Sequence, residues 1–418
     1  MATAPFSESA RFASIEKFAE RSRPIHVATA WANGETAFVG VFLPWSTLQA
    51  GICKLREPGL RKVDVAVVGT GWCGGIRAET LAMSPLVNRL HVAETRPERL
   101  AEVSRTTGAA TAVADYRELL EIADIEPVYI CATPETTHYP MARDALMAGK
   151  HVFLEKPIAL ELWEADELIA LAESNGLKFT IGYSQRFNPK FAYAKKKMSD
   201  GTLGEPVSAC VSRHITRGLG NKISGRGKLS PAAMESTHDL DFLLWLLEPA
   251  KPVRVYSQGV KRVMYPKNGA FDQQWIMVTL DNGCVITVGG GWIMPPGYPN
   301  FSTTWIEITG SEGALIIDDT HRDVWLSTME KGTVFPLSTM PGEQVDHVYA
   351  GAMGPETLHF LDAVVFDRPV QVTPESARQV MEVYTAADIS AETNEPVDLP
   401  LSNKGGMAAR PDSAGAVA

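Results

Sequence analysis

Cysteine and positive charge are both scarce in this chain of 418 residues. Its five cysteines, at positions 53, 73, 131, 210 and 284, form neither a C-x-x-C pair nor a cluster with histidine. The pattern argues against a disulfide framework and a structural metal, and it predicts a reducing, cytoplasmic location. The 39 basic residues are outnumbered by 49 acidic ones, and this acidic balance argues against a nucleic-acid partner.

A long apolar segment is also lacking. The best candidate, residues 36–53, carries no charge over 18 positions, which only reaches the lower limit for a membrane span, and Pro44 and two glycines interrupt it. Glu35 directly precedes this run, which is a poor match to a secretory signal. We therefore expect neither a membrane nor an export role.

The two ends of the chain show no motif. Residues 1–61 are interpreted as an accessory arm on the core or as the result of a start codon placed too early. Residues 402–418 are rich in alanine and glycine without an apolar period, and we predict a disordered tail there.

A glycine turn follows the first strongly apolar segment. Residues 62–68 are predicted to form a buried strand, Gly69-Thr-Gly71-Trp-Cys-Gly74 the turn, and residues 76–83 a helix. Such glycines let the backbone turn tightly and approach a pyrophosphate, whose charge is held by free N–H groups at the helix start. The alternative is a turn that only closes the strand on the helix.

The next strand favours the cofactor interpretation. Residues 89–93 are apolar and end in Glu94, which lies 25 positions after Gly69. A carboxylate that binds the adenosine ribose is expected roughly 20 residues after the turn. Two residues on, Arg96 could instead pair with a 2′-phosphate, but Pro97 starts the next helix and holds Arg96 extended, so that its side chain can point to solvent or stack on adenine. We therefore predict NAD rather than NADP.

Strands and helices continue to alternate. Residues 126–132 form another predicted strand, which ends at Thr133 and Pro134, and residues 139–147 form the next helix. With right-handed crossovers this pattern predicts a doubly wound parallel sheet, with Thr133 and Pro134 closing over the nicotinamide half. We expect His138 to cap or pack against the helix start rather than to act in chemistry.

The tripeptide Glu155-Lys156-Pro157 follows the apolar strand of residues 152–154. Pro157 lacks an N–H group and ends the strand, so Lys156 is aimed off the end of the sheet. Ligands bind outside the carboxyl ends of such strands, where an ammonium group can polarise a carbonyl or hydroxyl. The alternative is an ordinary surface lysine.

Together these motifs resemble the glucose-fructose oxidoreductase, inositol dehydrogenase and rhizopine-catabolism (Gfo/Idh/MocA) family of nicotinamide-dependent oxidoreductases. The resemblance covers residues 62–402 and rests on Gly69–Gly74, Cys131–Pro134 with His138, Gly149–Val152, Glu155–Pro157, Gly182–Pro189, Thr237–Asp241 and the helix of residues 374–393. It implies a Rossmann domain at residues 62–184, followed at 185–401 by an α+β domain with a large open mixed sheet. This second domain would carry the substrate and the interface of a homo-oligomer, a dimer or tetramer.

The resemblance also implies that Lys156 and His238 flank a sugar, polyol or related hydroxyl compound. Residues 234–247 are apolar at helical spacing, which puts His238 near a first turn, and a neutral imidazole can take a hydroxyl proton. Many family members have an aspartate four residues before this histidine, where this chain has Met234. Glu235, three before, could reach the imidazole on the same helix face. Otherwise His238 acts with Lys156 alone, or Glu235 binds substrate.

The substrate is only thinly specified. Arg186 could pin a substrate hydroxyl or the contact between domains, and Arg213 precedes a basic stretch with Lys222, Arg226 and Lys228, interpreted as a solvated loop. Trp292 and Tyr298 lie in or beside a proline- and glycine-rich connection and suit either a sugar face or a subunit contact.

The sequence thus predicts an NAD(P)-dependent dehydrogenase in which Lys156, His238 and Glu235 carry catalysis, and Arg186, Arg213, Trp292 and Tyr298 bind substrate. The alternative is a non-catalytic nucleotide-binding regulator on the same fold. The expected cofactor contacts are Gly69, Gly71, Trp72, Cys73, Gly74, Glu94, Thr95, Arg96, Thr133, Pro134, His138, Glu155 and Lys156.

Overall fold

A computed structural model describes residues 60–401, apart from residues 228, 301, 321, 338–341 and 347. The predicted arm or early start, with its uncharged run at 36–53, and the predicted tail at 402–418 lie outside the described residues. Contacts divide the chain into residues 1–61 and residues 62–418, and all elements named below belong to the second unit. Over the described part of the chain, no helix combines the length and the apolar character needed to cross a membrane.

The first sheet has six parallel strands in the order β3-β2-β1-β4-β5-β6. Its strands are β1 Val63–Val68, β2 Val87–Ala93, β3 Thr111–Val113, β4 Ile125–Ile130, β5 His151–Glu155 and β6 Phe179–Gly182. The helices between them are α3 Trp72–Ala82, α4 Pro97–Thr107, α5 Arg117–Leu120, the 3-10 helix η1 Glu135–Thr137, α6 His138–Met147 and α7 Leu162–Ser174. This is the predicted doubly wound parallel sheet.

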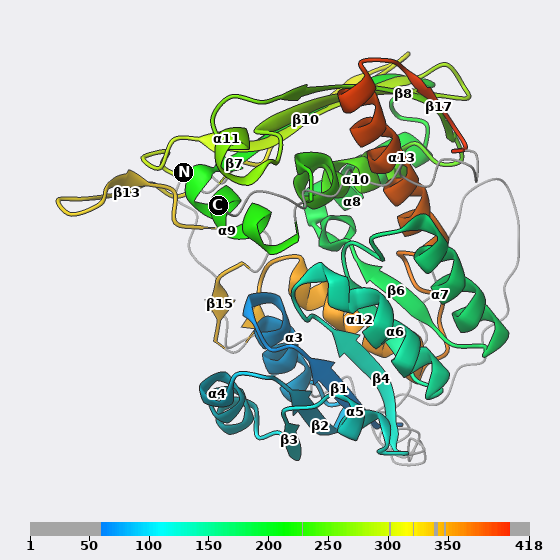
Figure 1. Cartoon of the computed structure of the whole chain (residues 1–418), viewed down its shortest axis with the longest axis vertical. Helices are drawn as coiled ribbons and strands as arrows, with labels where there is room; N and C mark the ends of the chain where they lie inside the picture. The colour runs from blue at the N-terminus through cyan, green and yellow to red at the C-terminus, as the bar shows by residue number, and fades with distance from the viewer. Residues whose placement is uncertain are drawn as a thin grey trace, which may run out of the picture. The chain divides into compact units, whose positions relative to one another are not determined.

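Helices cover both faces of this sheet, which explains why its central strands are largely apolar. All six residues of β1 are buried. One face packs against α3 and α4, and the other against α5, α6 and α7. A later helix, α12 (Met353–Val365), returns to the first face and lies beside α3, as Figure 1 shows in orange and blue. One face of the first sheet is therefore partly covered by a helix from the C-terminal half of the chain.

The second sheet has seven strands in the order β12-β11-β7-β10-β9-β8-β17, with β7 and β10 parallel and the other pairs antiparallel. Its strands are β7 Pro206–Thr216, β8 Pro252–Val260, β9 Gln273–Leu280, β10 Val285–Met294, β11 Ser302–Gly310, β12 Ala314–Asp318 and β17 Val397–Asp398. Two short ribbons, β13 Leu326–Thr328 with β14 Gly332–Val334 and β15 Gln344–Val345 with β16 Val348–Tyr349, follow β12. The remaining helices are the 3-10 helix η2 Ser184–Phe187, α8 Pro189–Ser199, α9 Arg217–Gly227, the π-helix η3 Ala232–Ser236, α10 Thr237–Leu246, α11 Tyr265–Asn268 and α13 Pro374–Thr393.

Within the described part of the chain, helices cover only one face of the second sheet. Ile276 and Val278 of β9 point into the core shared with α10 and α13, whereas the alternate residues Trp275 and Met277 are exposed. Trp305 of β11 is exposed on the same side as Trp275, because β10 and β7 align the two residues in one cross-strand row. This alternation is that of an antiparallel sheet with one face open, and the predicted large open mixed sheet is confirmed.

Two predicted boundaries were wrong. Strand β7 continues to Thr216 and therefore includes Arg213, and the predicted loop with Lys222 and Arg226 is helix α9. This helix forms despite its four glycines because tertiary packing outweighs propensity: Leu219 and Ile223 pack near Trp292, and a Cβ on Gly220 would lie 2.3 Å from the Cβ of Trp292. Lys228 lies outside the described residues.

Candidate active site

The glycine turn between β1 and α3 has the shape that a dinucleotide requires. Gly69 has φ +79°, and a Cβ there would lie 2.6 Å from the Cα of Ala132. A Cβ on Gly74 would lie 1.9 Å from the carbonyl oxygen of Gly69, whereas a Cβ on Gly71 would meet nothing within 4 Å. Because no side chain caps the start of α3 at Gly71, open space and helix N–H groups coincide there. These residues fit a pyrophosphate.

Glu94 stands at the end of β2 beside this turn. Its Oε2 accepts hydrogen bonds from the amide and hydroxyl of Thr70 at 3.0 and 3.2 Å, and its Oε1 accepts from the amide and Nε of Arg96 at 3.1 and 3.0 Å. Although burial opposes ionisation, these hydrogen bonds lower the pKa of Glu94 to about 2. The side chain of Arg96 is 61% exposed and turns back onto Glu94, and Thr95 is exposed beside it.

The other residues expected to contact the cofactor fall into exposed and buried groups. Trp72 is 62% exposed at the first position of α3, and Thr133 and Pro134 follow β4 just before η1. His138 is buried, with Nδ1 2.7 Å from the carbonyl oxygen of Pro157 and Nε2 3.1 Å from that of Ala132. His138 therefore ties the end of β4 to the turn after β5, in agreement with a packing role.

Cys73 follows Trp72 in the first turn of α3. Burial, with the charge of Glu155, raises the pKa of the Cys73 thiol to about 12. The thiol therefore stays protonated at neutral pH, and its role at the cofactor turn is limited to packing and to its backbone N–H group.

Lys156 leaves the end of β5 and reaches the second domain. Its Nζ donates to the carbonyl oxygen of Met234 in η3 at 2.6 Å. His238 follows in the first turn of α10, and its pKa is lowered well below the usual 6.5 by burial and by the charges of Lys156 and Arg213. Its Nδ1 is buried without a hydrogen-bond partner among the described residues. His238 is thus a neutral base close to a fixed ammonium group.

Glu235 does not contact the imidazole, contrary to one of the expected arrangements. It lies in the π-helix η3, so the register of an α-helix does not apply between it and His238. Its Oε2 lies 3.5 Å from Nη1 of Arg213, and its carbonyl oxygen also accepts from Arg213. The Nε of Arg213 donates to Asp239 at 2.9 Å. Arg213 is therefore buried between two carboxylates, and its charge is already compensated.

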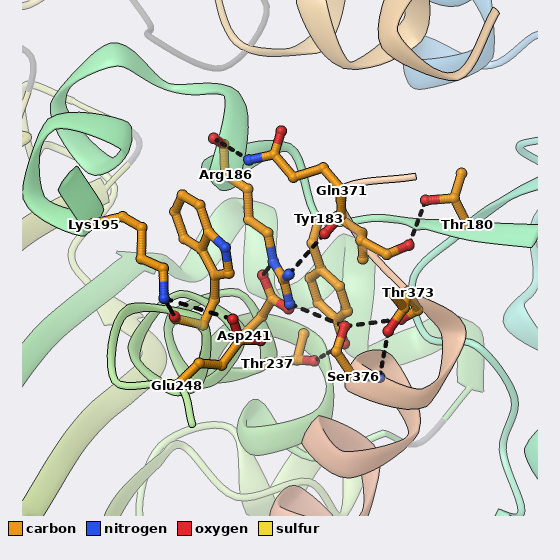
Figure 2. A network of polar contacts seen from close by, with 12 residues as sticks. Thr180, Tyr183, Arg186, Lys195, Thr237, Asp241, Glu248, Gln371, Thr373 and Ser376 are labelled. Atoms are coloured by element: carbon orange, nitrogen blue, oxygen red, sulfur yellow. Dashed lines mark hydrogen bonds and ion pairs between the residues drawn. The ribbon is translucent and has the colours of Figure 1, made fainter. Parts of the chain in front are cut away.

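Arg186 is part of an internal network rather than of an open site (Figure 2). Its Nε and Nη2 donate to the two carboxylate oxygens of Asp241 at 2.9 and 2.6 Å. Nη1 donates to the carbonyl oxygen of Gln371, and Nη2 also donates to Ser376 at the start of α13. Because the side chain is only 3% exposed and these partners all lie within residues 185–401, its contacts support a structural role inside the second domain.

The two aromatic candidates for substrate binding differ in exposure. Trp292 is fully buried within β10, and its indole N–H donates to the carbonyl oxygen of Phe271 at 2.8 Å. This burial leaves no ring face for a ligand, so Trp292 is withdrawn from the substrate residues. Tyr298 is half-buried in the loop after β10 and remains a candidate.

Two charged residues beneath Lys156 escaped the sequence analysis. Arg77 of α3 binds both Glu155 and Glu356, and all three lie close to the turn after β5. Arg77 lies in α3, directly after the glycine turn, so its position near the end of the sheet could have been predicted from the sequence. No signal could have identified Glu356, because it lies 279 residues farther along the chain.

The described residues contain no group of histidine, cysteine, aspartate or glutamate side chains arranged to hold a metal ion.

Comparisons with known proteins agree with this arrangement. Residues 63–183 match a family model described as an oxidoreductase family with an NAD-binding Rossmann fold, and residues 195–399 match the C-terminal α/β domain of that oxidoreductase family. The scyllo-inositol 2-dehydrogenase (NAD(+)) of Bacillus subtilis is 28% identical over 343 residues, which are 81% of this chain and 96% of the relative. The myo-inositol 2-dehydrogenase of Thermotoga maritima is 26% identical over 271 residues, 64% of this chain and 79% of the relative.

The fold is also found in solved structures. The scyllo-inositol dehydrogenase of Lactobacillus casei, solved with NAD(H) and scyllo-inositol, superposes with a TM-score of 0.70 at 22% identity over 81% of this chain and 99% of that one. Both the resemblance inferred from the motifs and the predicted fold class, a Rossmann domain followed by a domain with a mixed sheet, are confirmed.

Proposed function

The chain belongs to the Gfo/Idh/MocA family of NAD-binding oxidoreductases, and on this premise we propose that it is a dehydrogenase of a sugar, inositol or related polyol. The observation that carries the proposal is the convergence of Lys156 and His238 at the carboxyl end of β5. Lys156 Nζ is held at 2.6 Å by the Met234 carbonyl, and burial and neighbouring positive charge keep His238 neutral.

The two side chains suit complementary tasks. A bound NAD would supply the acceptor for the hydride on the carbon that bears the hydroxyl. Neutral His238 takes the hydroxyl proton, and the Lys156 ammonium donates a hydrogen bond to the same oxygen as negative charge develops on it. The charge of Lys156 also lowers the pKa of His238, so the base is uncharged when substrate binds.

The charges around the site favour a substrate without a net charge. Arg213 is paired with Glu235 and Asp239, so its guanidinium is not available to a substrate carboxylate or phosphate without breaking a buried ion pair. Polyol hydroxyl groups can instead use the oxygens of Glu235 and the ring of Tyr298. This compensation supports a sugar or inositol over a sugar acid.

The test is a screen of inositols, sugars and other polyols with NAD, read by the near-ultraviolet absorbance of NADH, with Lys156→Met as the control. We expect turnover by the wild-type chain with at least one polyol and on the order of 10² less with the variant. The regulator alternative draws support from His238 Nδ1, which lacks an acidic partner. Cofactor binding without turnover of any compound would favour that alternative.

We further propose that a second copy of the chain covers the open face of the seven-stranded sheet. Trp275 and Trp305 lie in one cross-strand row, and Met277 and Ile316 lie in the next, all exposed. Exposed apolar surface of this extent marks an interface in many proteins. Sedimentation of wild type and of a Trp275→Lys/Trp305→Lys variant tests the proposal, and a monomeric wild type would contradict it.

A further inference from the structure

Arg77 links helix α3 to the glutamate that directly precedes Lys156. Its side chain is 1% exposed, and Nε and Nη2 both donate to Oε1 of Glu155, at 2.9 and 2.7 Å. Its Cζ lies 4.1 Å from the centre of the Phe153 ring in β5. The guanidinium therefore fixes the end of β5 through a charged and an aromatic contact.

The same guanidinium is held from the other side by α12. Nη2 donates to Oε2 of Glu356 at 2.7 Å, and Nη1 donates to the hydroxyl of Thr357 at 2.8 Å. Glu356 is buried, and its Oε1 has no hydrogen-bond partner among the described residues. Arg77 is thus shared between two carboxylates from distant parts of the chain.

This sharing is electrostatically expensive. With both carboxylates ionised the three side chains carry a net charge of −1 in a buried site, which is unfavourable. Burial, together with the charge of Glu155, raises the pKa of Glu356 to about 7, although Arg77 opposes the shift. Glu356 therefore gains or loses a proton near neutral pH. It is linked to Glu155 through Arg77, which donates to both carboxylates.

We propose that Arg77 and Glu356 are positioning residues for the reaction, which hold Glu155 and, through the adjacent backbone, set the placement of Lys156. When Glu356 is protonated, Arg77 pairs fully with Glu155. When Glu356 is ionised, it competes for the guanidinium and adds a negative charge near the Lys156 ammonium. The inference rests on the proposed function only in the experiment that measures turnover, and not in those that measure stability or the labelling of Lys156.

Other titratable groups face this cluster from the packed elements. Burial raises the pKa of the Cys73 thiol to about 12, and it raises those of the Cys131 thiol and the Tyr129 hydroxyl well above their usual values, so all three stay protonated at neutral pH. The charged neighbours are Lys156, which acts on Cys73, Asp241, which acts on Glu356, and Asp362, which acts on Tyr129. Glu356 is thus the member expected to titrate near neutrality.

The first experiment measures the proton on Glu356 without any substrate. Because the folded-state pKa of about 7 lies above the ordinary value of 4.5, the folded protein holds a proton that the unfolded chain releases, and its stability falls as pH rises through this window. Glu356→Gln removes this dependence. Its Tm relative to wild type should therefore rise between pH of about 5 and about 8. Asp362→Asn, on the same helix but without a hydrogen bond to Arg77, is the matched control and should show no such trend.

The second experiment reads the surroundings of Lys156 directly. Each protein is labelled with limiting acetic anhydride across the same pH range, and the modified Lys156 peptide is quantified by mass spectrometry. In wild type, the rate at Lys156 relative to an exposed lysine should change near pH 7. This step should be lost in Glu356→Gln and kept in Asp362→Asn.

The third experiment uses turnover. Arg77→Lys keeps the charge but loses the planar fork that bonds both carboxylates. We expect kcat to fall on the order of tenfold or more, because a small misplacement of a reacting group is costly, while the Kd for NADH stays unchanged. Glu356→Gln should show, at every pH, the kcat that wild type has when Glu356 is protonated, and so lose the step near pH 7 in its pH profile.

The possible failures are distinguishable. If Glu356→Gln and wild type give superimposable profiles of Tm and of Lys156 labelling, the positioning proposal is overturned whatever the enzyme activity. If both profiles behave as expected and no polyol is turned over, the proposed function fails while the link from Glu356 to Lys156 stands.

Discussion

The two sheets of this protein place their candidate catalytic residues by different means. Lys156 comes directly from the end of β5, in a sheet whose strands and turns follow one another along the chain. His238 follows a π-helix that is seated on β10, bonded to β9 and stabilised by α13. Consequently one half of the site depends on local structure, and the other depends on contacts between residues far apart in sequence.

Several contacts between distant residues fix the position of the Met234 carbonyl in the π-helix η3, which accepts from Lys156. Gln274 Oε1 accepts from the amide of Ala232 at 2.9 Å, and its Nε2 donates to Asp388 of α13 at 2.9 Å. Ser230 donates to the same carboxylate at 2.8 Å. These bonds hold η3 so that the Met234 carbonyl faces Lys156. The second half of the site should therefore be the more sensitive to distant substitutions.

The largest effect on stability is expected at the buried ion pair between Arg186 and Asp241. Arg186→Met removes one partner of a buried ion pair and leaves Asp241 uncompensated, at a cost of about 3–5 kcal/mol. Urea unfolding measures the loss. The double variant Arg186→Met/Asp241→Leu should recover most of it, since an apolar replacement of both partners is often neutral. If the single variant Arg186→Met is as stable as wild type, the stability of the fold does not depend on this ion pair.

Lys156→Met should have the largest effect on turnover. We expect kcat to fall on the order of 10² or more, about 2.7 kcal/mol, because the positioned hydrogen-bond donor to the reacting oxygen is lost. The Kd for NADH, measured by fluorescence quenching, should change little, since the glycine turn and Glu94 are intact. Unchanged turnover would remove Lys156 from the mechanism.

A smaller effect is expected from the seat of the π-helix. A Cβ on Gly290 would lie 2.0 Å from Oγ of Ser236, so Gly290→Ala should displace η3 and with it the Met234 carbonyl. We expect kcat to fall roughly tenfold, with NADH binding unchanged.

The matched control for this substitution is Ser236→Ala, which removes the clashing oxygen. That hydroxyl is buried without a hydrogen-bond partner among the described residues, so its loss alone should be nearly neutral. Combined with Gly290→Ala it should restore kcat. Failure of the rescue would mean that the π-helix does not transmit the effect.

The smallest effect concerns the choice of cofactor. Glu94, with a pKa of about 2, is ionised at neutral pH and repels a 2′-phosphate, while Arg96 is already paired with it. We expect kcat/KM with NAD to exceed that with NADP, and Glu94→Ser to narrow the difference. An equal or higher kcat/KM with NADP in the wild-type chain would contradict this prediction.

The sequence by itself determined the half of the site that is built on the first sheet and is proposed to bind the cofactor. The buried parallel strands are largely apolar on both faces, glycines mark a turn that a Cβ would obstruct, and Glu94 and Lys156 each stand at a strand end. All these signals lie within a few residues of the feature that they predict. For this reason the parallel sheet, the turn and the exit point of Lys156 were foreseeable without knowledge of any distant contact.

Only the tertiary structure decided which charges are free and where His238 stands. The sequence gives no sign that Arg186 and Arg213 are paired. In the structure Arg186 pairs with Asp241 of α10, and Arg213 pairs with Asp239 of α10 and Glu235 of η3. The π-helix and the return of α12 to the first sheet depend on Gly290, Gln274 and Glu356, which lie tens to hundreds of residues from their partners. Burial and pairing of a charge are properties of such contacts, so no local pattern could reveal them.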